Sequence, residues 1–475
     1  MHDNRQRYEI SKNFLPLPAM SRKIRNIFSL LITFSVVTFL FSCSDIDPDL
    51  DNSFIHGSTE SQTGNTNRVE NPAYRNVFLM YSCGYNDLSS YLKNDIKEVV
   101  ENFQVQNSRD VLLIFSHNTA KNYDYKTPSS PILTRIYKDK AGMTVKDTLD
   151  VPGINGNTVA ASPQTLNEIL TYVKDKFPAS VYGMLLSSHG SGWVPAKYIY
   201  NPNYYEGLDS DSNFDTILRK PRKEADDKPL VKSVGIHLIS YDKYVYPYPY
   251  YEAHEINITD FAQALPMKLD YLLFDACLMG GVETAYQLRG KCDILIASQA
   301  EILADGMDYK TLSSYIFDSK WPDYIGLCEN YYNYYNRQSG QYQSATISMV
   351  DCNKLEPLAD VCKEIFSSCR SDIALLEGSK TVQGYFREED RSTLQWYYDL
   401  EDIAINAGAS EEQLGRLNAA LSDCVLYKNA TERLLGSRLI QHHCGLSMYL
   451  PFKKRTYLNT FYKTLDWNKE TGLVE

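Results

Sequence analysis

The stretch Leu272–Leu273–Phe274–Asp275–Ala276–Cys277–Leu278–Met279–Gly280 decides the fold class of this chain, because an apolar run stops abruptly at a reactive thiol. The stretch Tyr182–Gly192 is built in the same way and delivers an imidazole, His189, before two glycines. Runs with so few polar residues are typical of strands buried on both faces of a parallel sheet. Sites in open α/β sheets form beyond the carboxyl ends of such strands. We therefore expect Cys277 and His189 to lie at the same edge of one sheet.

A thiol and an imidazole at one sheet edge supply the nucleophile and proton carrier of a cysteine peptidase. Cys277 would attack the scissile carbonyl, and His189 would give a proton to the leaving amine. The backbone N–H groups of Gly190 and Cys277 are the predicted oxyanion hole, since glycine permits close approach. The structural alternative is a buried small hydrophobe for Cys277 and a hydrogen-bonded polar residue for His189. The two strand contexts favour catalysis.

Both motifs resemble those of the clostripain family, within the caspase-like cysteine peptidases. The resemblance runs from about residue 76 to about residue 451, and Phe274–Met279 is its most specific match. The other matching segments are Asn76–Tyr81, Asn86–Leu88, Pro178–Ala179, His189–Trp193, Tyr398–Leu400 and Gly445–Pro451. The resemblance implies a caspase-like three-layer sandwich with a mostly parallel central sheet and a catalytic dyad without a third residue. His189 and Cys277 lie 88 positions apart, more than we expect for the family, with the excess near Tyr198–Tyr251.

Two acidic residues are the predicted specificity determinants. An Arg or Lys side chain is stable in a pocket only when its charge is paired. Asp275 points to the same side of its strand as Cys277 by period-two alternation, and Asp305 follows the next strand. Both resemble the pocket acids of the family, with Asp308 in reserve. Cleavage after Arg, and less well after Lys, is expected because the planar guanidinium pairs bidentately with carboxylates. The alternative for Asp275 is a strand-end turn or cap.

Self-cleavage is predicted between the two catalytic motifs. Residues 201–233 are polar and rich in basic side chains, and proteolytic nicking concentrates in such loops. Clostripain-like enzymes resemble this pattern in being cut between His and Cys. Lys220 and Lys228 are discounted because proline follows each of them. The remaining candidates are Lys197, Arg219, Arg222, Lys223 and Lys232. The alternative is an ordinary solvated loop.

The N-terminus has the pattern of a secretory signal. Basic residues precede an apolar run, Ile27–Phe41, that is short for a membrane span and ends at Ser42–Cys43. Cys43 resembles the lipidated residue of a bacterial lipobox; the alternative is a plain signal peptide with a chance Cys. We expect a lipoprotein signal peptide over residues 1–42 and a flexible tether over residues 43–72. The location would be the bacterial outer membrane, periplasmic or surface-exposed.

The remaining chain is predicted to hold a catalytic domain over residues 73–350 and a largely helical C-terminal subdomain over residues 351–475. Removing residues 1–42, with six basic and two acidic side chains, changes the net charge from −11 to −15. That charge argues against nucleic acid as a partner and is compatible with peptide substrates that carry Arg or Lys. No CxxC pair or acidic loop suggests a metal or other cofactor, and calcium enters only through the family resemblance. The other eight cysteines have the irregular spacing and apolar neighbours of buried free thiols.

A binding protein is the competing class. The chain carries 37 tyrosines, with clusters at Tyr244–Tyr251 and Tyr331–Tyr335. Exposed aromatic side chains can bind sugars or protein partners, so a catalytically weak or inactive surface lipoprotein is the alternative. We favour the enzyme because His189 and Cys277 are both present, and because Tyr331–Tyr335 also fits a packed helix.

Overall fold

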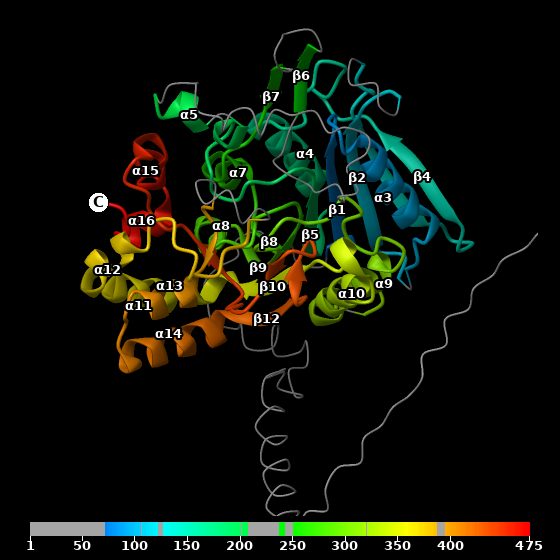
Figure 1. The fold of residues 1–475 in the computed structure, drawn as a ribbon. Helices are drawn as coiled ribbons and strands as arrows, with labels where there is room; N and C mark the ends of the chain where they lie inside the picture. Colours follow the sequence, from blue (N-terminus) through cyan, green and yellow to red (C-terminus); the bar gives the residue numbers. More distant parts are fainter. Residues whose placement is uncertain are drawn as a thin grey trace, which may run out of the picture. The chain divides into compact units, whose positions relative to one another are not determined.

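The structure is a computed structural model that describes residues 72–105, 107–121, 127–200, 202–207, 237–242, 250–319, 321–386 and 395–475. Its centre is a nine-stranded sheet (Figure 1). The strands, in spatial order, are β12 (Val425–Ala430), β10 (Thr346–Asp351), β9 (Cys292–Ala297), β8 (Leu269–Asp275), β5 (Ala179–Ser187), β1 (Tyr74–Gly84), β2 (Asp110–Asn118), β3 (Ile132–Lys138) and β4 (Thr144–Leu149). The strands from β9 to β2 are parallel, and the two strands at each edge are antiparallel. The predicted α/β fold is confirmed.

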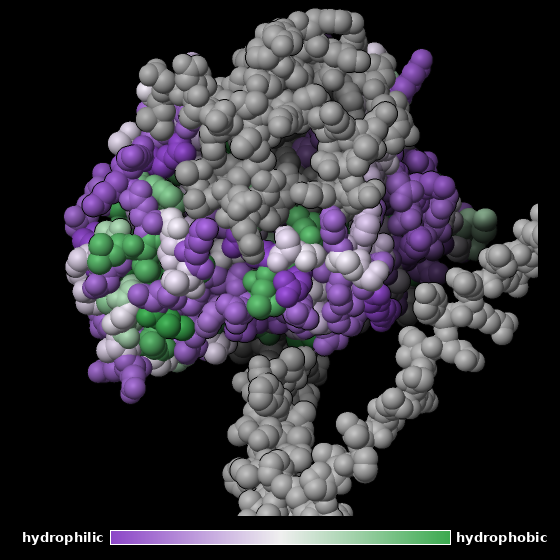
Figure 2. Space-filling view, viewed as in Figure 1, coloured by the Kyte–Doolittle hydropathy of each residue, from purple (hydrophilic) through white to green (hydrophobic). Residues whose placement is uncertain are grey.

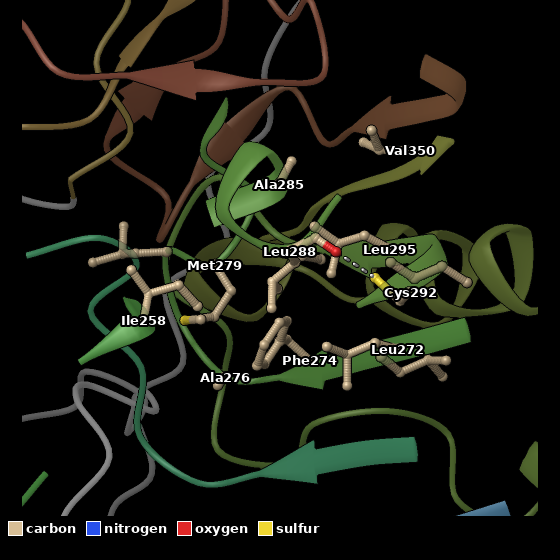
Figure 3. Packing of buried hydrophobic residues seen from close by; sticks show 14 of the residues in the cluster. Ile258, Leu272, Phe274, Ala276, Met279, Ala285, Leu288, Cys292, Leu295 and Val350 are labelled. Carbon is tan, nitrogen blue, oxygen red and sulfur yellow. Dashed lines mark hydrogen bonds between the residues drawn. The ribbon is translucent and has the colours of Figure 1, made fainter. Parts of the chain in front are cut away.

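The parallel strands are apolar because both of their faces are covered. All seven residues of β8 are buried. Leu272 and Phe274 of this strand point into an apolar cluster that Leu288 and Met279 also enter (Figure 3). Because side chains alternate along a strand, Asp275 lies on the opposite face. Period-two alternation therefore separates the core of this strand from its polar end.

Helices cover both faces of the sheet. Phe78 of β1 contacts Phe317, with ring centroids 6.4 Å apart, whereas the Tyr81 hydroxyl donates to the Ala160 carbonyl at 2.8 Å. Phe78 and Tyr81 point to opposite faces, so the helices beside Phe317 and Ala160 lie on opposite faces too. The helices are α3 (Ser89–Glu101), α4 (Pro163–Lys176), α5 (Pro202–Tyr205), α7 (Ile258–Ala264), α8 (Val282–Leu288), α9 (Leu312–Phe317), α10 (Tyr324–Asn336), α11 (Leu355–Ser368), α12 (Arg370–Leu375), α13 (Leu400–Asn406), α14 (Glu411–Cys424), α15 (Thr456–Tyr462) and α16 (Asp466–Thr471).

Short elements complete the fold. They are the strand pairs β6 (His237–Asp242) with β7 (Tyr250–His254), β11 (Tyr398–Asp399) with β15 (Ser447–Met448) and β13 (Arg433–Leu434) with β14 (Arg438–Leu439), and the 3-10 turns η1 (Tyr198–Tyr200), η2 (Gly340–Tyr342) and η3 (Cys352–Lys354). The largely apolar run Leu446–Leu450 predicts a closing strand, but it forms only the two-residue β15 outside the main sheet. The sequence pattern also missed that β12, from the largely helical end of the chain, adds an edge strand next to β10.

Local helix signals were accurate in α4 and inaccurate in α3. Ser162 caps α4 by accepting the Thr165 N–H at 3.2 Å, and proline opens the helix as predicted. Asn86 and Asp87 stand just before the helical apolar pattern, which predicts that one of them caps α3. The N-cap is instead Leu88, which makes no side-chain cap hydrogen bond. Asn86 instead accepts the Leu88 N–H before the helix begins, which leaves Asp87 available for another contact.

The nine cysteines of the described ranges are all free and buried; they are Cys277 and the eight that were interpreted as buried free thiols. Among the same residues, no helix is both long and apolar enough to cross a bilayer. One compact unit spans Ile55–Glu475, and the domain boundary at residue 350 stays a prediction. The signal peptide over residues 1–42, Cys43 and the tether up to residue 71 lie outside the described residues. Figure 2 shows a largely hydrophilic face on which apolar residues form small, separate patches.

Candidate active site

Two loops form the candidate site where neighbouring parallel strands end. The His loop, Ser188–Val194, follows β5, and the Cys loop, Ala276–Gly281, follows β8. The register of the two strands pairs Ser187 with Asp275, so both loops leave the sheet at the same level. The structure therefore brings the segments of His189 and Cys277 together, as the sequence predicts.

Two glycines allow the His loop to pack directly on the Cys loop. A Cβ atom on Gly190 would lie 2.5 Å from the Cys277 carbonyl oxygen and 3.1 Å from its backbone nitrogen. A Cβ atom on Gly192, whose φ of +58° already favours glycine, would lie 2.5 Å from the Leu278 carbonyl oxygen. Real Cβ contacts are longer than this, so only glycine permits such close approach. The close approach keeps the backbone N–H groups of Gly190 and Cys277 in one small region.

His189 has a carboxylate partner that the sequence did not reveal. Its Nε2 lies 2.6 Å from Oδ1 of Asp87, in the turn between β1 and α3. The imidazole is buried, whereas the Asp87 carboxylate is largely exposed. A carboxylate on one ring nitrogen fixes the tautomer and leaves the other nitrogen for proton transfer. That other nitrogen, Nδ1, is buried and makes no hydrogen bond. The dipeptide Asn86–Asp87 after the first strand was the available signal, but we interpreted it as a helix cap.

The Cys277 thiol is fully buried and contacts the loop after β9. Its Sγ accepts the backbone N–H of Ile302 at 3.1 Å. A hydrogen bond donated to sulfur stabilises the thiolate, which is the nucleophilic form. Since Nδ1 of His189 makes no hydrogen bond, it is not bonded to this sulfur. The thiol and the imidazole therefore have separate hydrogen-bond partners, Ile302 and Asp87.

Asp275 is buried and Asp305 is exposed, and both lie at the edge of the sheet where the strands β8 and β9 end. Asp275 is fully buried and accepts the hydroxyls of Ser187 at 2.7 Å and Tyr309 at 2.5 Å. Its carboxylate thus binds side-chain hydroxyls from neighbouring segments, which differs from the cap that was the alternative. Asp305 is exposed and belongs to the loop that carries Ile302 and Tyr309. The reserve residue, Asp308, accepts from Thr311 at 2.9 Å. One loop therefore contacts Cys277 and Asp275 and carries Asp305.

A cavity of about 70 Å³ lies against the His loop. His189 and the carboxylate of Glu255 line it together with apolar side chains that include Phe261 and Met279. Burial raises the pKa of Glu255 to about 7, although the Lys197 N–H donates to this carboxylate at 2.7 Å. Lys197 is exposed and adopts a φ of +67°, which is unusual for a residue with a Cβ. This contact holds the backbone of Lys197 in place.

A larger surface groove of about 740 Å³ lies away from the two catalytic loops, between α7, the start of β9 and α16. Two of its cations are paired, because Arg289 bonds Glu356 and Asp466 and Lys469 also bonds Asp466. Lys291 donates to the Leu265 carbonyl at 3.2 Å. The groove contains neither His189 nor Cys277, and we do not assign the chemistry to it.

Several predicted features are not part of the described site. Arg219, Arg222, Lys223 and Lys232 lie outside the described residues, as does most of the tyrosine cluster at 244–251. Tyr331 and Tyr335 are buried in α10, so the second tyrosine cluster is a packed helix as we preferred. No group of His, Cys, Asp and Glu side chains within the described ranges is arranged to hold a metal ion.

A thiol and an imidazole beyond adjacent parallel strands, in a sheet covered by helices on both faces, define a caspase-like α/β protein. The sequence matches the clostripain family, peptidase family C11, over residues 80–223 and 240–473, and the chain belongs to that family. The interruption between these two ranges falls in the long segment between the catalytic motifs.

Individual relatives agree with this membership. Clostripain of Hathewaya histolytica is 24% identical over 262 residues, which are 52% of this chain and 43% of clostripain. The match thus spans less than half of that relative. An inactive zymogen of a C11 protease from Parabacteroides distasonis is 26% identical, with a TM-score of 0.64 over 85% of this chain and 99% of the zymogen. Iotapain, a secreted C11 cysteine protease of Bacteroides thetaiotaomicron, shares the fold at 22% identity, with a TM-score of 0.61 over 85% of this chain and 100% of iotapain.

Proposed function

We propose that this protein is a cysteine endopeptidase that cuts after Arg, and less well after Lys, with Cys277 as nucleophile and His189 as proton carrier. The observation that carries the proposal is the packing of the His loop on the Cys loop through Gly190. Asp87 is a positioning residue in this scheme, because its carboxylate lies 2.6 Å from Nε2 and so orients the ring. The backbone N–H groups of Gly190 and Cys277 would stabilise the oxyanion.

The preference for basic residues follows from the charges at the sheet edge. Asp275 is a buried carboxylate two residues before the nucleophile, and Asp305 adds a second, exposed one in the loop after β9. A guanidinium that reached both would have its charge paired by two carboxylates. Protein or peptide substrates with Arg or Lys before the scissile bond are therefore the expected partners.

Turnover of peptides that differ only at the residue before the cut tests this specificity. We expect kcat/KM for the Arg peptide to exceed that for the Leu peptide by about 100-fold or more, which is typical when a charged group meets a matched site. Asp305→Asn should reduce this ratio, whereas Asp360→Asn on α11, an equal change in net charge, should leave it unchanged. Equal rates for Arg, Leu and Asp peptides would contradict the proposal. No turnover by the processed protein would favour the binding-protein alternative.

Self-cleavage is proposed within the polar segment that contains Arg219, Arg222, Lys223 and Lys232. Lys197 is a poorer candidate because the residue after it, Tyr198, is fully buried and its hydroxyl donates to Glu206 at 2.6 Å. A protease needs an extended segment, so cutting after Lys197 would require local unfolding. We expect fragments from the wild type and a single chain from Cys277→Ala, as determined by N-terminal sequencing. Identical fragments from both proteins would assign the cut to another protease.

The membrane anchor is a separate proposal that concerns Cys43. Lipidation of this residue would hold the protein at the bacterial outer membrane. We expect Cys43→Ala to release the protein from the membrane fraction or to block its processing, as measured by fractionation and intact mass. Ser44→Ala is the matched control and should remain in the membrane fraction. An unchanged membrane fraction for Cys43→Ala would refute lipidation at this site.

A further inference from the structure

The last part of the chain contacts both catalytic loops. We call residues 395–462 the C-terminal clamp. The Tyr397 hydroxyl donates to the Ser191 carbonyl of the His loop at 2.7 Å. The Ser447 N–H donates to the Gly280 carbonyl of the Cys loop at 3.0 Å. These contacts join segments that lie more than 160 residues apart in sequence.

Two tyrosines of the clamp contact both the His loop and the helix that follows the Cys loop. The rings of Tyr449 and Tyr462 pack on Trp193 of the His loop, with centroids 4.7 Å and 4.9 Å from its ring. The backbone N–H of Tyr449 and the Tyr462 hydroxyl donate to Oε1 of Glu283 at 2.7 Å and 2.8 Å. Glu283 is fully buried in the first turn of α8, two residues after the Cys loop ends. The two tyrosines therefore link Trp193 of the His loop to the start of the helix that the Cys loop leads into.

We propose that the C-terminal clamp positions the His loop and the Cys loop relative to each other, and that Glu283 is the positioning residue on which its contacts converge. Glu283 acts through Tyr449 and Tyr462 and does not touch the reacting atoms. The interface is polar and buried, so its geometry depends on one acceptor that satisfies two donors. Losing that acceptor leaves both donors unpaired in the core. It also removes the hydrogen bond that holds the Tyr462 ring where it packs on Trp193.

The protonation of Glu283 indicates which variant preserves this arrangement. Burial raises the pKa of its carboxyl to about 7, against the lowering effect of the hydrogen bonds from Tyr449 and Tyr462. Its Oε2 is buried without a hydrogen-bond partner. A neutral side chain with one carbonyl oxygen therefore reproduces the contacts. Glutamine has that chemistry, whereas methionine has similar length and no acceptor of this kind.

The experiment compares Glu283→Met, Glu283→Gln and Tyr462→Phe. The control is Tyr182→Phe, which removes a hydroxyl that donates to the Phe177 carbonyl at 3.0 Å, outside the clamp and at the end of β5 far from the His loop. Steady-state kinetics with the best-cut peptide, alkylation of Cys277 by iodoacetamide followed by mass spectrometry, and the thermal midpoint are measured for each. We expect Glu283→Met to lower kcat by about 10- to 100-fold with KM nearly unchanged, as for misplaced catalytic groups. The rate at which iodoacetamide alkylates Cys277 should change together with kcat. Glu283→Gln should have the wild-type value of both quantities.

The control separates positioning from general stability. Tyr182→Phe should lower the thermal midpoint while leaving kcat and the alkylation rate unchanged. Wild-type kcat and alkylation in Glu283→Met would overturn the proposal. Equal losses of activity in Tyr462→Phe and Tyr182→Phe would overturn it too, and this pair decides if Glu283→Met does not fold. The alkylation rates need no substrate, so they decide the proposal even if the cleavage specificity proposed above fails.

Discussion

Replacing Cys277 by alanine is expected to abolish peptide cleavage, with kcat/KM lowered by about 10⁴-fold or more, as when a nucleophile is removed from a covalent mechanism. The fold should persist, because the side chain is small and its described contacts are with the backbone of Ile302. Cleavage of a fluorogenic peptide with Arg before the cut measures the loss, and the thermal midpoint shows that the protein remains folded.

Cys424→Ala is the matched control for this prediction. Burial raises the pKa of the Cys424 thiol to about 12, so it stays protonated at neutral pH and cannot act as a nucleophile. We expect this variant to retain full activity. Activity that survives in Cys277→Ala, or that disappears in Cys424→Ala, would show that the nucleophile has been assigned wrongly.

Gly190→Ala is expected to lower kcat by about 100-fold or more, since a displacement of about 1 Å at a catalytic group has effects of this size. The added methyl would lie 2.5 Å from the Cys277 carbonyl oxygen and 2.9 Å from Cβ of Ala276. Neither neighbour is the end of a flexible side chain, so one of the two loops must move. Kinetics with the Arg peptide and circular dichroism distinguish a moved loop from an unfolded protein.

Gly156→Ala is the comparison for Gly190→Ala. A Cβ atom at Gly156 meets nothing within 4 Å, so the same chemical change places no strain on the fold. We expect this variant to have wild-type kcat. Wild-type kcat in Gly190→Ala would mean that close packing of the two loops does not position the site.

The sequence predicted those features of the fold that depend on residues close together in the chain. The runs around Val181 and Leu272 were interpreted correctly as buried strands, because burial on both faces excludes polar side chains from them. The alternation along β8 predicted that Asp275 points to the same side as Cys277, and one loop, through Tyr309 and Ile302, contacts both residues. The hydrogen bond between Asp275 and Ser187 was not predictable, because it depends on the register between β5 and β8.

The features that the sequence did not predict are contacts between segments far apart in the chain. Asp87 follows a strand and precedes a helix, which is equally typical of a cap, and only the folded chain shows that it contacts His189. The pairing of β12 with β10 was missed because β12 alternates poorly and follows a long helix. No local sequence pattern indicates that Tyr449 and Tyr462 contact Trp193. Each of these residues could be any aromatic residue of the core.

The C-terminal clamp has a consequence for the order of events during biosynthesis. Translation delivers His189 and Cys277 long before Tyr462, and each domain-sized segment of a nascent chain begins to fold as it emerges. Until residue 462 has left the ribosome or the translocation channel, Trp193 and Glu283 lack the partners that join their loops. If the clamp positions the two loops as proposed, a chain that lacks these residues would carry both reactive groups without the contacts that join their loops. Activity would then appear only after Tyr462 has been synthesised and has packed on Trp193.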